Sequence, residues 1–366
     1  MIPRLEPQFE SSLNLYTEFL LELQIHGFQG EVQQDEGSRT VFSTDNSIYQ
    51  VLPQAVVFPK NYEDVQRLMR LAAQPRFQSI CFGPRGGGTG TNGQSLTNGV
   101  VIDLSRHLNQ ILEINVEQRW ARVQAGVVKD QLNAAIEPHG LFFAPELSTS
   151  NRATIGGMVN TDASGQGSCL YGKTRDHVLA LETVFLDGSQ WRSVPLDEPE
   201  FTAIRQRQDL IGRAHQLLKN IHDDHAEAIQ ATFPVLNRCL TGYDLAHIKN
   251  AAGQYDLNSL LCGSEGTLGM VIEVTLNLLP IPAYSALINI QYNSFDAALR
   301  DVPNLLNWQA ASIETVDTTI LNLAKTDIIW NHIRHYFNGP EKSSNQSAET
   351  LNGLNLVERL PTQKRN

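Results

Sequence analysis

A glycine-rich loop that directly follows a short apolar segment constrains this chain more than any other feature of its sequence. The apolar residues 79–82 predict a strand. The loop after it reads Pro-Arg-Gly-Gly-Gly-Thr-Gly-Thr-Asn-Gly from residue 84, with five glycines in the eight positions 86–93. Glycine lets a backbone turn sharply or approach another group closely, and successive free N–H groups in such a turn form a concave anion site. The loop therefore predicts a pyrophosphate cradle, with a purely structural turn as the alternative.

The same loop also satisfies a second pattern, the G-x-G-x-x-G of NAD-binding Rossmann folds. Residues 88–93 match it, and Glu113 lies about 20 residues further on. That fold needs a helix that begins at the third glycine and points its N–H groups at the pyrophosphate. Here only residues 94–99, which contain the turn pair Asn98-Gly99, precede the next predicted strand. An NAD-dependent dehydrogenase therefore remains only as a third hypothesis, which would require NADH binding.

Composition limits the remaining function classes. The 366 residues suggest about two domains, and 28 Lys and Arg against 39 Asp and Glu give a net charge of −11. Such an acidic chain has no general attraction to nucleic acid or anionic membranes. We expect no transmembrane segment, because each apolar stretch is interrupted by polar residues. The four cysteines form no CxxC pair, so we expect buried free thiols, a reducing cytoplasmic location and no iron–sulfur cluster in this chain.

Hydrophobic periodicity predicts the order of the elements. A helix is expected at 9–26, with its apolar face on Leu13, Tyr16, Phe19, Leu20 and Leu23. The elements predicted after it are strands at 55–58, 79–82, 100–104, 179–187, 190–194 and 270–278, a hairpin over 111–127, and helices at 62–73 (capped by Asn61), 129–137 and 210–229.

Two further stretches have a distinct composition. Residues 146–172 are rich in Ser, Thr, Asn and Gly, which is typical of loops. After Pro280 and Pro282, a strand–helix–strand–helix unit is predicted over 286–292, 294–307, 311–316 and 318–336. The residues from 338 onward are polar and follow no pattern.

Three motifs in sequence order resemble the vanillyl-alcohol-oxidase-like flavoproteins, also called the PCMH-type FAD-binding fold. The first is the loop at 84–93. The second combines residues 144–147, 154–158 and 162–165, and the third is Gly-Ser-Glu-Gly-Thr-Leu-Gly at 263–269. The resemblance implies an α+β fold in which two α+β subdomains hold FAD, followed by the start of a ferredoxin-like cap domain.

Shorter motifs narrow the resemblance to one branch of that family. Residues 46–49, 148–152 and 240–244 are similar to the D-2-hydroxyacid dehydrogenases of the D-lactate, glycolate and D-2-hydroxyglutarate types. The most similar are the N-terminal parts of long bacterial FAD and iron–sulfur D-2-hydroxyglutarate dehydrogenases. The implied domains are a lead-in over 1–50, the FAD-binding domain over 51–283 (subdomains 51–145 and 146–283), a partial cap over 284–337 and a polar, disordered tail over 338–366.

The resemblance also implies which residues contact FAD. The backbone of the first loop would bind the pyrophosphate, the second motif would lie against the ribityl chain and isoalloxazine, and the third would contact the cofactor through backbone groups. The residues implied are Pro84, Arg85, Gly86, Gly87, Gly88, Thr89, Gly90, Thr91, Asn92, Pro145, Ser148, Thr149, Gly156, Gly157, Asn160, Ala163, Ser164, Gly165, Gly266, Val271 and Ile272. Some relatives attach FAD through a histidine in the first loop. This loop has none, so we expect non-covalent FAD, which acid precipitation would release from the protein.

The implied reaction moves a hydride from the Cα of a D-2-hydroxy acid, such as D-2-hydroxyglutarate or D-lactate, onto flavin N5. Electrons would pass to an iron–sulfur domain or subunit outside this chain. The family's cap carries a metal-binding histidine cluster, which is expected beyond this chain, so no metal ligand and no catalytic residue is assigned. The alternative is an FAD-binding fragment without turnover.

Several polar residues have two interpretations that the sequence leaves open. The pairs His332/His335 and His222/His225 have helical spacing, and a solvated helix face is favoured over a metal site for both. Asp244 and His247 are placed either near the flavin or in ordinary capping. Arg152 either meets a substrate carboxylate or holds its loop.

Overall fold

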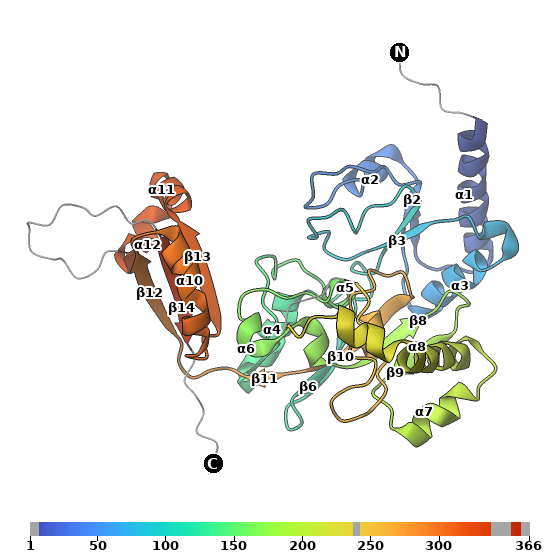
Figure 1. The fold of residues 1–366 in the computed structure, drawn as a ribbon. Coiled ribbons are helices and arrows are strands. Elements are labelled where there is room, and N and C mark those ends of the chain that lie inside the picture. Colours follow the sequence, from blue (N-terminus) through green and yellow to red (C-terminus); the bar gives the residue numbers. More distant parts are fainter. Residues whose placement is uncertain (1–6, 237–241, 338–352, 360–366) are drawn as a thin grey trace, which may run out of the picture. The chain divides into compact units, whose positions relative to one another are not determined.

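The computed structural model describes residues 7–236, 242–337 and 353–359. The chain divides into two compact units. The first unit comprises Met1–Ser164 and Lys173–Pro280, and the second comprises Gly165–Gly172 and Ile281–Asn366 (Figure 1). Each unit has its own sheets and helices, and each is described by itself.

A four-stranded sheet opens the first unit. Its order is β1-β2-β4-β3, and β4 runs parallel to both β2 and β3. The elements of this part are α1 (Pro7–Ile25), β1 (Glu31–Gln33), α2 (Glu36–Val41), β2 (Ala55–Phe58), α3 (Tyr62–Ala72), β3 (Phe82–Arg85) and β4 (Val100–Asp103). Phe19, Leu20 and Leu23 of α1 are buried, as the helical spacing predicts. The Asn61 side chain caps α3 by accepting from the Asp64 N–H at 2.9 Å, which confirms that expectation.

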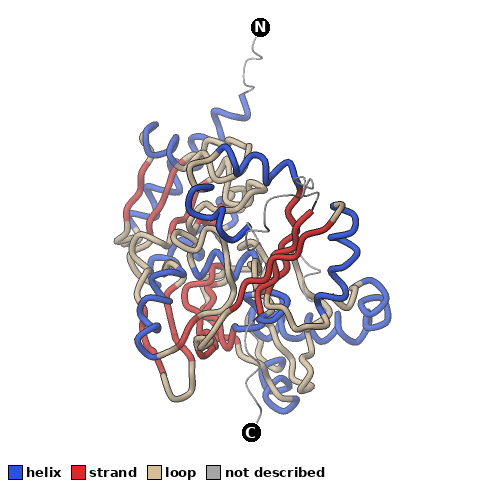
Figure 2. The backbone as a smooth tube through the Cα atoms, turned by 90° about the vertical axis from the view of Figure 1, so that its left-hand side faces the viewer, coloured by secondary structure: helices blue, strands red, loops and turns tan. Residues whose placement is uncertain are grey.

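A five-stranded antiparallel sheet follows in the first unit, in the order β5-β6-β10-β8-β9. Figure 2 shows the strands of all the sheets in red. The elements around it are β5 (Ile111–Asn115), β6 (Trp120–Gln124), α4 (Lys129–Ile136), β7 (Leu141–Phe142), α5 (Ile155–Thr161), β8 (Val178–Val184), β9 (Gln190–Ser193), α7 (Glu198–Arg205), α8 (Leu210–Thr232), α9 (Asn258–Leu261), β10 (Met270–Asn277) and β11 (Leu279–Pro280). β10 sends Ile272 into the core that includes α1 and α3 and Val274 into the core that includes α8, because an irregularity in its pairing between Val271 and Glu273 shifts the alternation of side chains along the strand.

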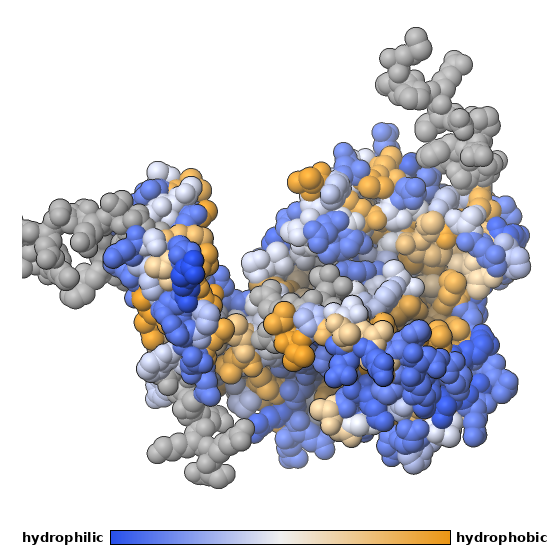
Figure 3. Space-filling model, in the orientation of Figure 1, coloured by the Kyte–Doolittle hydropathy of each residue, from blue (hydrophilic) through white to orange (hydrophobic). Residues whose placement is uncertain are grey.

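The second unit is built on a three-stranded antiparallel sheet in the order β12-β14-β13. Its elements are α6 (Ser168–Tyr171), β12 (Ala286–Tyr292), α10 (Phe295–Leu306), β13 (Ser312–Asp317), α11 (Thr318–Thr326), α12 (Trp330–Phe337) and β14 (Gly353–Arg359). Since both outer strands run antiparallel to β14, they are parallel to each other, and α10 joins them as a split β-α-β crossover. Apolar side chains of α10 and α11 also reach the surface of this unit, among them Leu306 and Leu323. Hydrophobic residues at the surface of the chain are orange in Figure 3.

The structure corrects five expectations about local structure. The strand expected at 79–82 lies at β3 instead, because the pairing with β4 begins at Phe82 and includes Arg85. The loop expected over 146–172 contains α5 and α6. The helix expected over 318–336 is divided at Asp327, whose extended backbone and side chain, which accepts from the Ile329 N–H, end α11 and precede α12. Residues 353–359 of the expected tail form β14. Among the described cysteines, Cys262 is a buried free thiol, whereas the free thiols Cys81 and Cys169 are exposed.

Candidate functional site

A cavity of about 470 Å³ lies within the first unit, among loops of this unit. Its volume falls in the range of small-molecule and cofactor sites. Three segments that are distant in the sequence supply most of its wall: 84–90, 147–164 and 265–271. Shorter contributions come from residues 104–105 and 125–126. The cavity is therefore a meeting point of loops rather than a groove along one element.

The glycine-rich loop presents unused N–H donors to this cavity. Among the described residues, the backbone N–H groups of 86–91 donate no hydrogen bond, whereas the Asn92 N–H donates to the Gln94 side chain at 3.0 Å. A run of backbone donors without a protein acceptor is unusual and requires water or a ligand. The donor set suits an anionic group such as a pyrophosphate, because every donor is a neutral N–H held by the fold.

The Arg85 side chain supports this loop from the side of residues 42–46. Its guanidinium donates to the Thr44 carbonyl at 2.8 Å and to the Phe42 carbonyl at 3.4 Å. The Asn46 N–H donates in turn to the Gly88 carbonyl at 3.1 Å. The Arg85 guanidinium therefore binds backbone carbonyls, and Arg85 acts as a positioning residue for the loop.

Glycine is required in the loops because they pack directly on one another. A Cβ built on Gly87 would lie 2.1 Å from the carbonyl oxygen of Arg152, and one on Gly266 would lie 2.2 Å from Cγ of Pro84. Gly266 also has a φ of +76°, which L side chains rarely adopt. The first loop thus touches the 148–152 segment at Gly87 and the third motif at Pro84. The absent side chains allow the three segments to converge on one cavity.

Helix α5 begins at the wall of the cavity and is fixed at its N-terminus. The Thr154 hydroxyl accepts from the Gly157 N–H at 3.2 Å, and the Gly156 N–H donates to the Ala125 carbonyl at 2.7 Å. Asn160, one turn later, links the second and third segments. Its side chain donates to the Gly156 carbonyl at 2.8 Å and accepts from the Gly266 N–H at 3.0 Å. Asn160 therefore holds the third loop at the end of α5.

A buried ion pair forms another part of the wall. Lys173 Nζ lies 2.6 Å from Asp162 Oδ2, and the two side chains are 3% and 4% exposed. The other oxygen of Asp162 accepts from the Arg175 N–H at 3.0 Å. The Arg175 guanidinium also pairs with Asp244, which is fully buried and accepts from His247 Nδ1 at 2.6 Å. Arg175 thus links Asp244 to Asp162 in the cavity wall.

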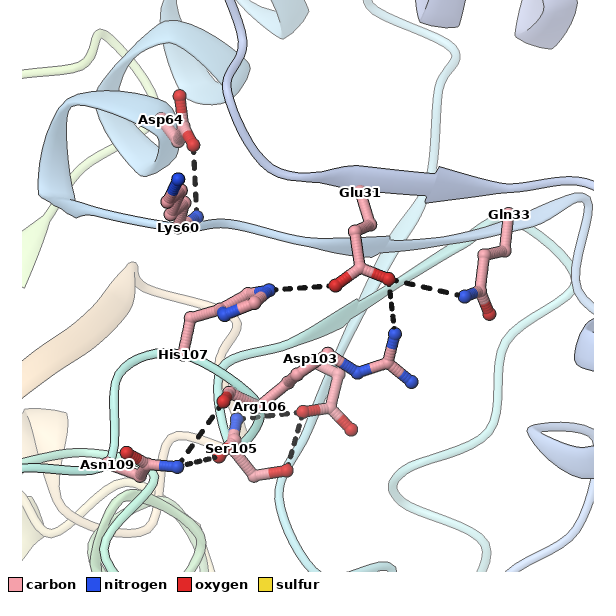
Figure 4. Close-up of polar contacts among 9 residues, drawn as sticks. All are labelled: Glu31, Gln33, Lys60, Asp64, Asp103, Ser105, Arg106, His107 and Asn109. Atoms are coloured by element: carbon pink, nitrogen blue, oxygen red, sulfur yellow. Dashed lines mark hydrogen bonds and ion pairs between the residues drawn. The ribbon is translucent and has the colours of Figure 1, made fainter.

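Polar contacts at the end of β4 hold the 104–105 segment of the cavity wall (Figure 4). The Asp103 carboxylate accepts from the N–H and from the hydroxyl of Ser105, each at 2.7 Å. Burial raises the pKa of Asp103, and the Ser105 hydrogen bonds oppose that shift. Glu31 of β1 binds Arg106 at 2.5 Å and His107 at 2.9 Å. These contacts fasten the turn after β4 to the edge of the first sheet.

Glu265 is an ionisable cavity residue in a strained backbone conformation. Its φ is +52°, an uncommon value for a residue other than glycine. Its N–H donates to the Asn160 carbonyl at 3.0 Å. Burial raises the pKa of Glu265 from 4.5 to about 6, and a hydrogen bond with the Thr161 side chain lowers it in part. With a pKa of about 6, the Glu265 carboxyl group changes its charge in a pH range above that of an ordinary glutamate.

The raised pKa predicts a pH-dependent effect of Glu265 on stability. Since the pKa is higher in the folded state than the ordinary 4.5, the favourable contribution is complete below that value and is lost as the pH rises through about 6. We expect Glu265→Gln to be more stable than wild type at about pH 8, by at most about 1 kcal/mol because solvent screens the half-buried group, and equally stable at about pH 4. Urea unfolding midpoints at both pH values measure the difference. Glu117→Gln, on the exposed hairpin turn, is the control; the same pH dependence in both variants would contradict the assignment.

The structure gathers most of the residues implied by the motifs around this cavity. Those that line it are Pro84, Arg85, Gly86, Gly87, Gly88, Thr89, Gly90, Thr149, Gly156, Gly157, Asn160, Ala163, Ser164 and Val271. Those that do not line it are Thr91, Asn92, Pro145, Ser148, Gly165, Gly266 and Ile272. Ile272 is fully buried in the core on the other face of β10, and Gly165 belongs to the second unit. Gly266 serves the site through its packing on Pro84.

Some lining residues are not among the FAD contacts that the motifs imply. They are Gln94, Ser95, Leu104, Ser105, Ala125, Gly126, Leu147, Ala153, Thr154, Met158, Thr161, Asp162, Lys173, Glu265 and Met270. The sequence could have indicated Thr154, because a Thr before an apolar and glycine-containing turn is a helix N-cap signal. It could not have indicated the cavity positions of Lys173 and Glu265, since burial and cavity contact depend on the tertiary fold.

The structure gives contacts for Asp244, His247, Arg152 and His222. The Asp244 carboxylate lies 2.6 Å from His247 Nδ1, and neither residue lines the cavity. The Arg152 carbonyl faces Gly87, and its guanidinium contacts the neighbouring Asn151 at 3.2 Å. His222 contacts Asp223 on α8, and the His335 side chain lies outside the described part. Within the described residues, no group of three or more His, Cys, Asp or Glu side chains is arranged to hold a metal ion. Nor does any helix there have the length and apolar character to cross a bilayer.

Comparison with known proteins agrees with this geometry. Residues 53–193 match the family model described as FAD binding domain. The fold also resembles the solved structure of an alkyldihydroxyacetonephosphate synthase, with a TM-score of 0.63 at 18% identity over 94% of this chain and 56% of that one. The α+β fold around this cavity is thus the PCMH-type FAD-binding fold, as the motifs predicted. Residues 53–193 of the chain are thus similar to the FAD binding domains of that family.

Within that class, the chain is similar to curated D-2-hydroxyglutarate dehydrogenases. It is 57% identical to the one from Pseudomonas putida over 94% of this chain, and 47% identical to the one from Escherichia coli over 98% of it. It is 31% identical to glycolate oxidase subunit GlcD of Bacillus subtilis over 77% of this chain and 50% of that protein. The chain spans about a third of the length of the dehydrogenases, 34% and 35% respectively.

Proposed function

We propose that this chain binds FAD non-covalently in the cavity of the first unit. The observation that carries the proposal is the run of unused backbone N–H groups at 86–91. These donors would hold the pyrophosphate, Arg85 would keep the loop in place, and the segments 156–164 and 265–271 would enclose the rest of the cofactor. Thr91, Asn92, Pro145, Ser148, Gly165 and Ile272 do not line the cavity, so the proposal assigns them no direct contact with FAD.

We propose further that the chain is the FAD-holding part of a D-2-hydroxy acid dehydrogenase, with D-2-hydroxyglutarate as the first candidate substrate. The support is the 57% identity to a protein of that name. FAD supplies the acceptor for the hydride that leaves the substrate Cα. The chain's own loops exclude water from the cofactor and orient it. An iron–sulfur domain or subunit outside this chain is the proposed electron acceptor, and the free cysteines are consistent with a cytoplasmic location.

The alternative function is FAD binding without turnover, since the chain spans 34% of the length of the Pseudomonas putida dehydrogenase. We expect the purified chain to show a flavin absorption spectrum, and acid precipitation to leave the yellow colour in the supernatant. Anaerobic addition of D-2-hydroxyglutarate then separates the two functions, with L-2-hydroxyglutarate as the matched control. Bleaching by the D-enantiomer alone supports the dehydrogenase, and a persistent spectrum supports the binding fragment. No flavin after reconstitution contradicts both.

A further inference from the structure

The buried lysine in the cavity wall is not accounted for by FAD binding through backbone groups. Lys173 lines the cavity, is 3% exposed at its side chain and contacts Asp162 at 2.6 Å. Lysine is almost never fully buried unless it is paired, because desolvating the ammonium group is costly. A charged pair buried in the cavity wall therefore has a local cost that a neutral pair would avoid.

The fold holds this pair in one arrangement. Asp162 follows α5 with a φ of +47°, a strained value for a residue with a side chain. Its second oxygen is fixed by the Arg175 N–H at 3.0 Å, and the Arg175 guanidinium is itself neutralised by Asp244. Asp162 is thereby oriented toward Lys173. The cavity wall carries a cation with its counter-ion next to it, so replacing the lysine alone would leave a negative charge in the wall.

Lys173 differs from the other charged residues of the cavity. The Arg85 guanidinium is directed to the carbonyls of residues 42 and 44, and Glu265 carries negative charge when ionised. Among the residues that line the cavity, Lys173 is therefore the cation beside the 160–164 segment. An isoalloxazine ring becomes more negative on reduction, whereas the adenine end of FAD does not change charge. A nearby positive charge favours the reduced ring, and one protein lever on a bound flavin is the charge beside it.

We propose that Lys173 contacts the isoalloxazine ring of bound FAD and raises its reduction potential by stabilising the negative charge of the reduced ring, with Asp162 as its positioning residue. This inference rests on the proposed binding of FAD in the same cavity. It adds which end of the cavity holds the ring and which side chain sets the redox property of the cofactor.

The test is the midpoint potential of FAD bound to the whole chain, measured by equilibration with a reference dye. For Lys173→Met we expect the equilibrium constant for two-electron reduction to fall about ten-fold, which corresponds to a potential about 30 mV more negative. Lys173→Arg, which keeps the charge, should stay close to wild type. Asp162→Asn, which removes the counter-ion and suits the αL backbone, should shift the potential in the positive direction.

The control is Lys129→Met, which removes another buried lysine of the first unit, 4% exposed on α4 and outside the cavity wall. An unchanged potential in Lys173→Met, or an equal shift in Lys129→Met, overturns the inference while FAD binding stands. If Lys173→Met fails to retain FAD, the sign of the shift in Asp162→Asn decides, and a shift that is absent or negative overturns the inference. A wild-type chain that retains no FAD overturns the proposed function and this inference together.

Discussion

Gly87→Ala is expected to weaken FAD binding about 100-fold while the chain remains folded. The added Cβ would lie 2.1 Å from the carbonyl oxygen and 2.9 Å from the carbonyl carbon of Arg152, both of which are backbone atoms. No side-chain rotation relieves such a contact, so the first loop and the 152–157 segment must separate. Overpacking of this kind costs about 1–3 kcal/mol, and about 2.7 kcal/mol corresponds to a 100-fold loss of affinity. Titration of the apo-protein with FAD, followed by flavin fluorescence, measures the loss.

The matched control is Gly37→Ala in α2. Its Cβ would meet only the Asp35 side chain, at 3.2 Å, and Gly37 lies outside the cavity wall. Alanine is also the better helix former, so we expect wild-type affinity. Far-UV circular dichroism of both variants distinguishes a displaced loop from an unfolded chain. Wild-type FAD affinity in Gly87→Ala would show that the convergence of the two loops is not needed for the site.

The loop illustrates what a local pattern in the sequence can predict. The glycine density after an apolar segment correctly predicted an irregular turn with free N–H groups, and the absence of a helix after Gly93 correctly excluded the Rossmann arrangement. The pattern did not show why each glycine is there. Gly87 and Gly266 are needed for contacts with residues that are far away in the sequence. A pattern of glycines predicts backbone freedom, but the partner of each close approach is set by the tertiary fold.

Strand pairing explains the other differences. The strand at 82–85 is placed by its parallel register with β4, which local hydrophobicity does not specify. Ile272 was implied as a cofactor contact through backbone groups; its side chain lies in the core, whereas Met270 and Val271 line the cavity. Strand β14 comes from a polar stretch, and its place between β12 and β13 provides the pairing that its own sequence does not predict. The positions of β3 and β14 thus both depend on a partner strand outside the local sequence.

Charged groups were the least predictable part of the site. Asp162 and Lys173 are eleven positions apart in the numbering, in a stretch that resembles a loop, and nothing in that stretch indicates that both side chains are buried. Asp244 was considered as a capping residue or a flavin neighbour, and it is a fully buried partner of Arg175. Burial of a charge depends on how the chain closes around it, so these residues follow only from the structure.

Asp244→Ala is expected to destabilise the first unit by about 3 kcal/mol. The substitution removes the carboxylate that pairs with Arg175, accepts from His247 at 2.6 Å and accepts from the Ala246 N–H at 3.0 Å. Arg175 is 14% exposed and would keep only its contact of 3.6 Å with Asp162. Removing one partner of a buried ion pair leaves an uncompensated charge, which costs about 3–5 kcal/mol. The remaining contact with Asp162 places the expected value at the lower end of that range. The midpoint of urea unfolding, followed by circular dichroism, measures the loss.

Asp223→Ala separates this effect from the loss of any carboxylate. Asp223 pairs with Lys219 on α8 in the same unit, but its side chain is 47% exposed. Exposed pairs contribute about 0–1 kcal/mol, because solvent screens the charges and two long side chains lose freedom. A difference of about 2 kcal/mol or more between the two variants is therefore expected. If both variants lose the same stability, the burial of Asp244 is not what makes its ion pair important.

Asp244→Ala is also expected to raise the reduction potential of bound FAD. Without Asp244, Arg175 would compete with Lys173 for Asp162, so the potential should shift in the same direction as in Asp162→Asn.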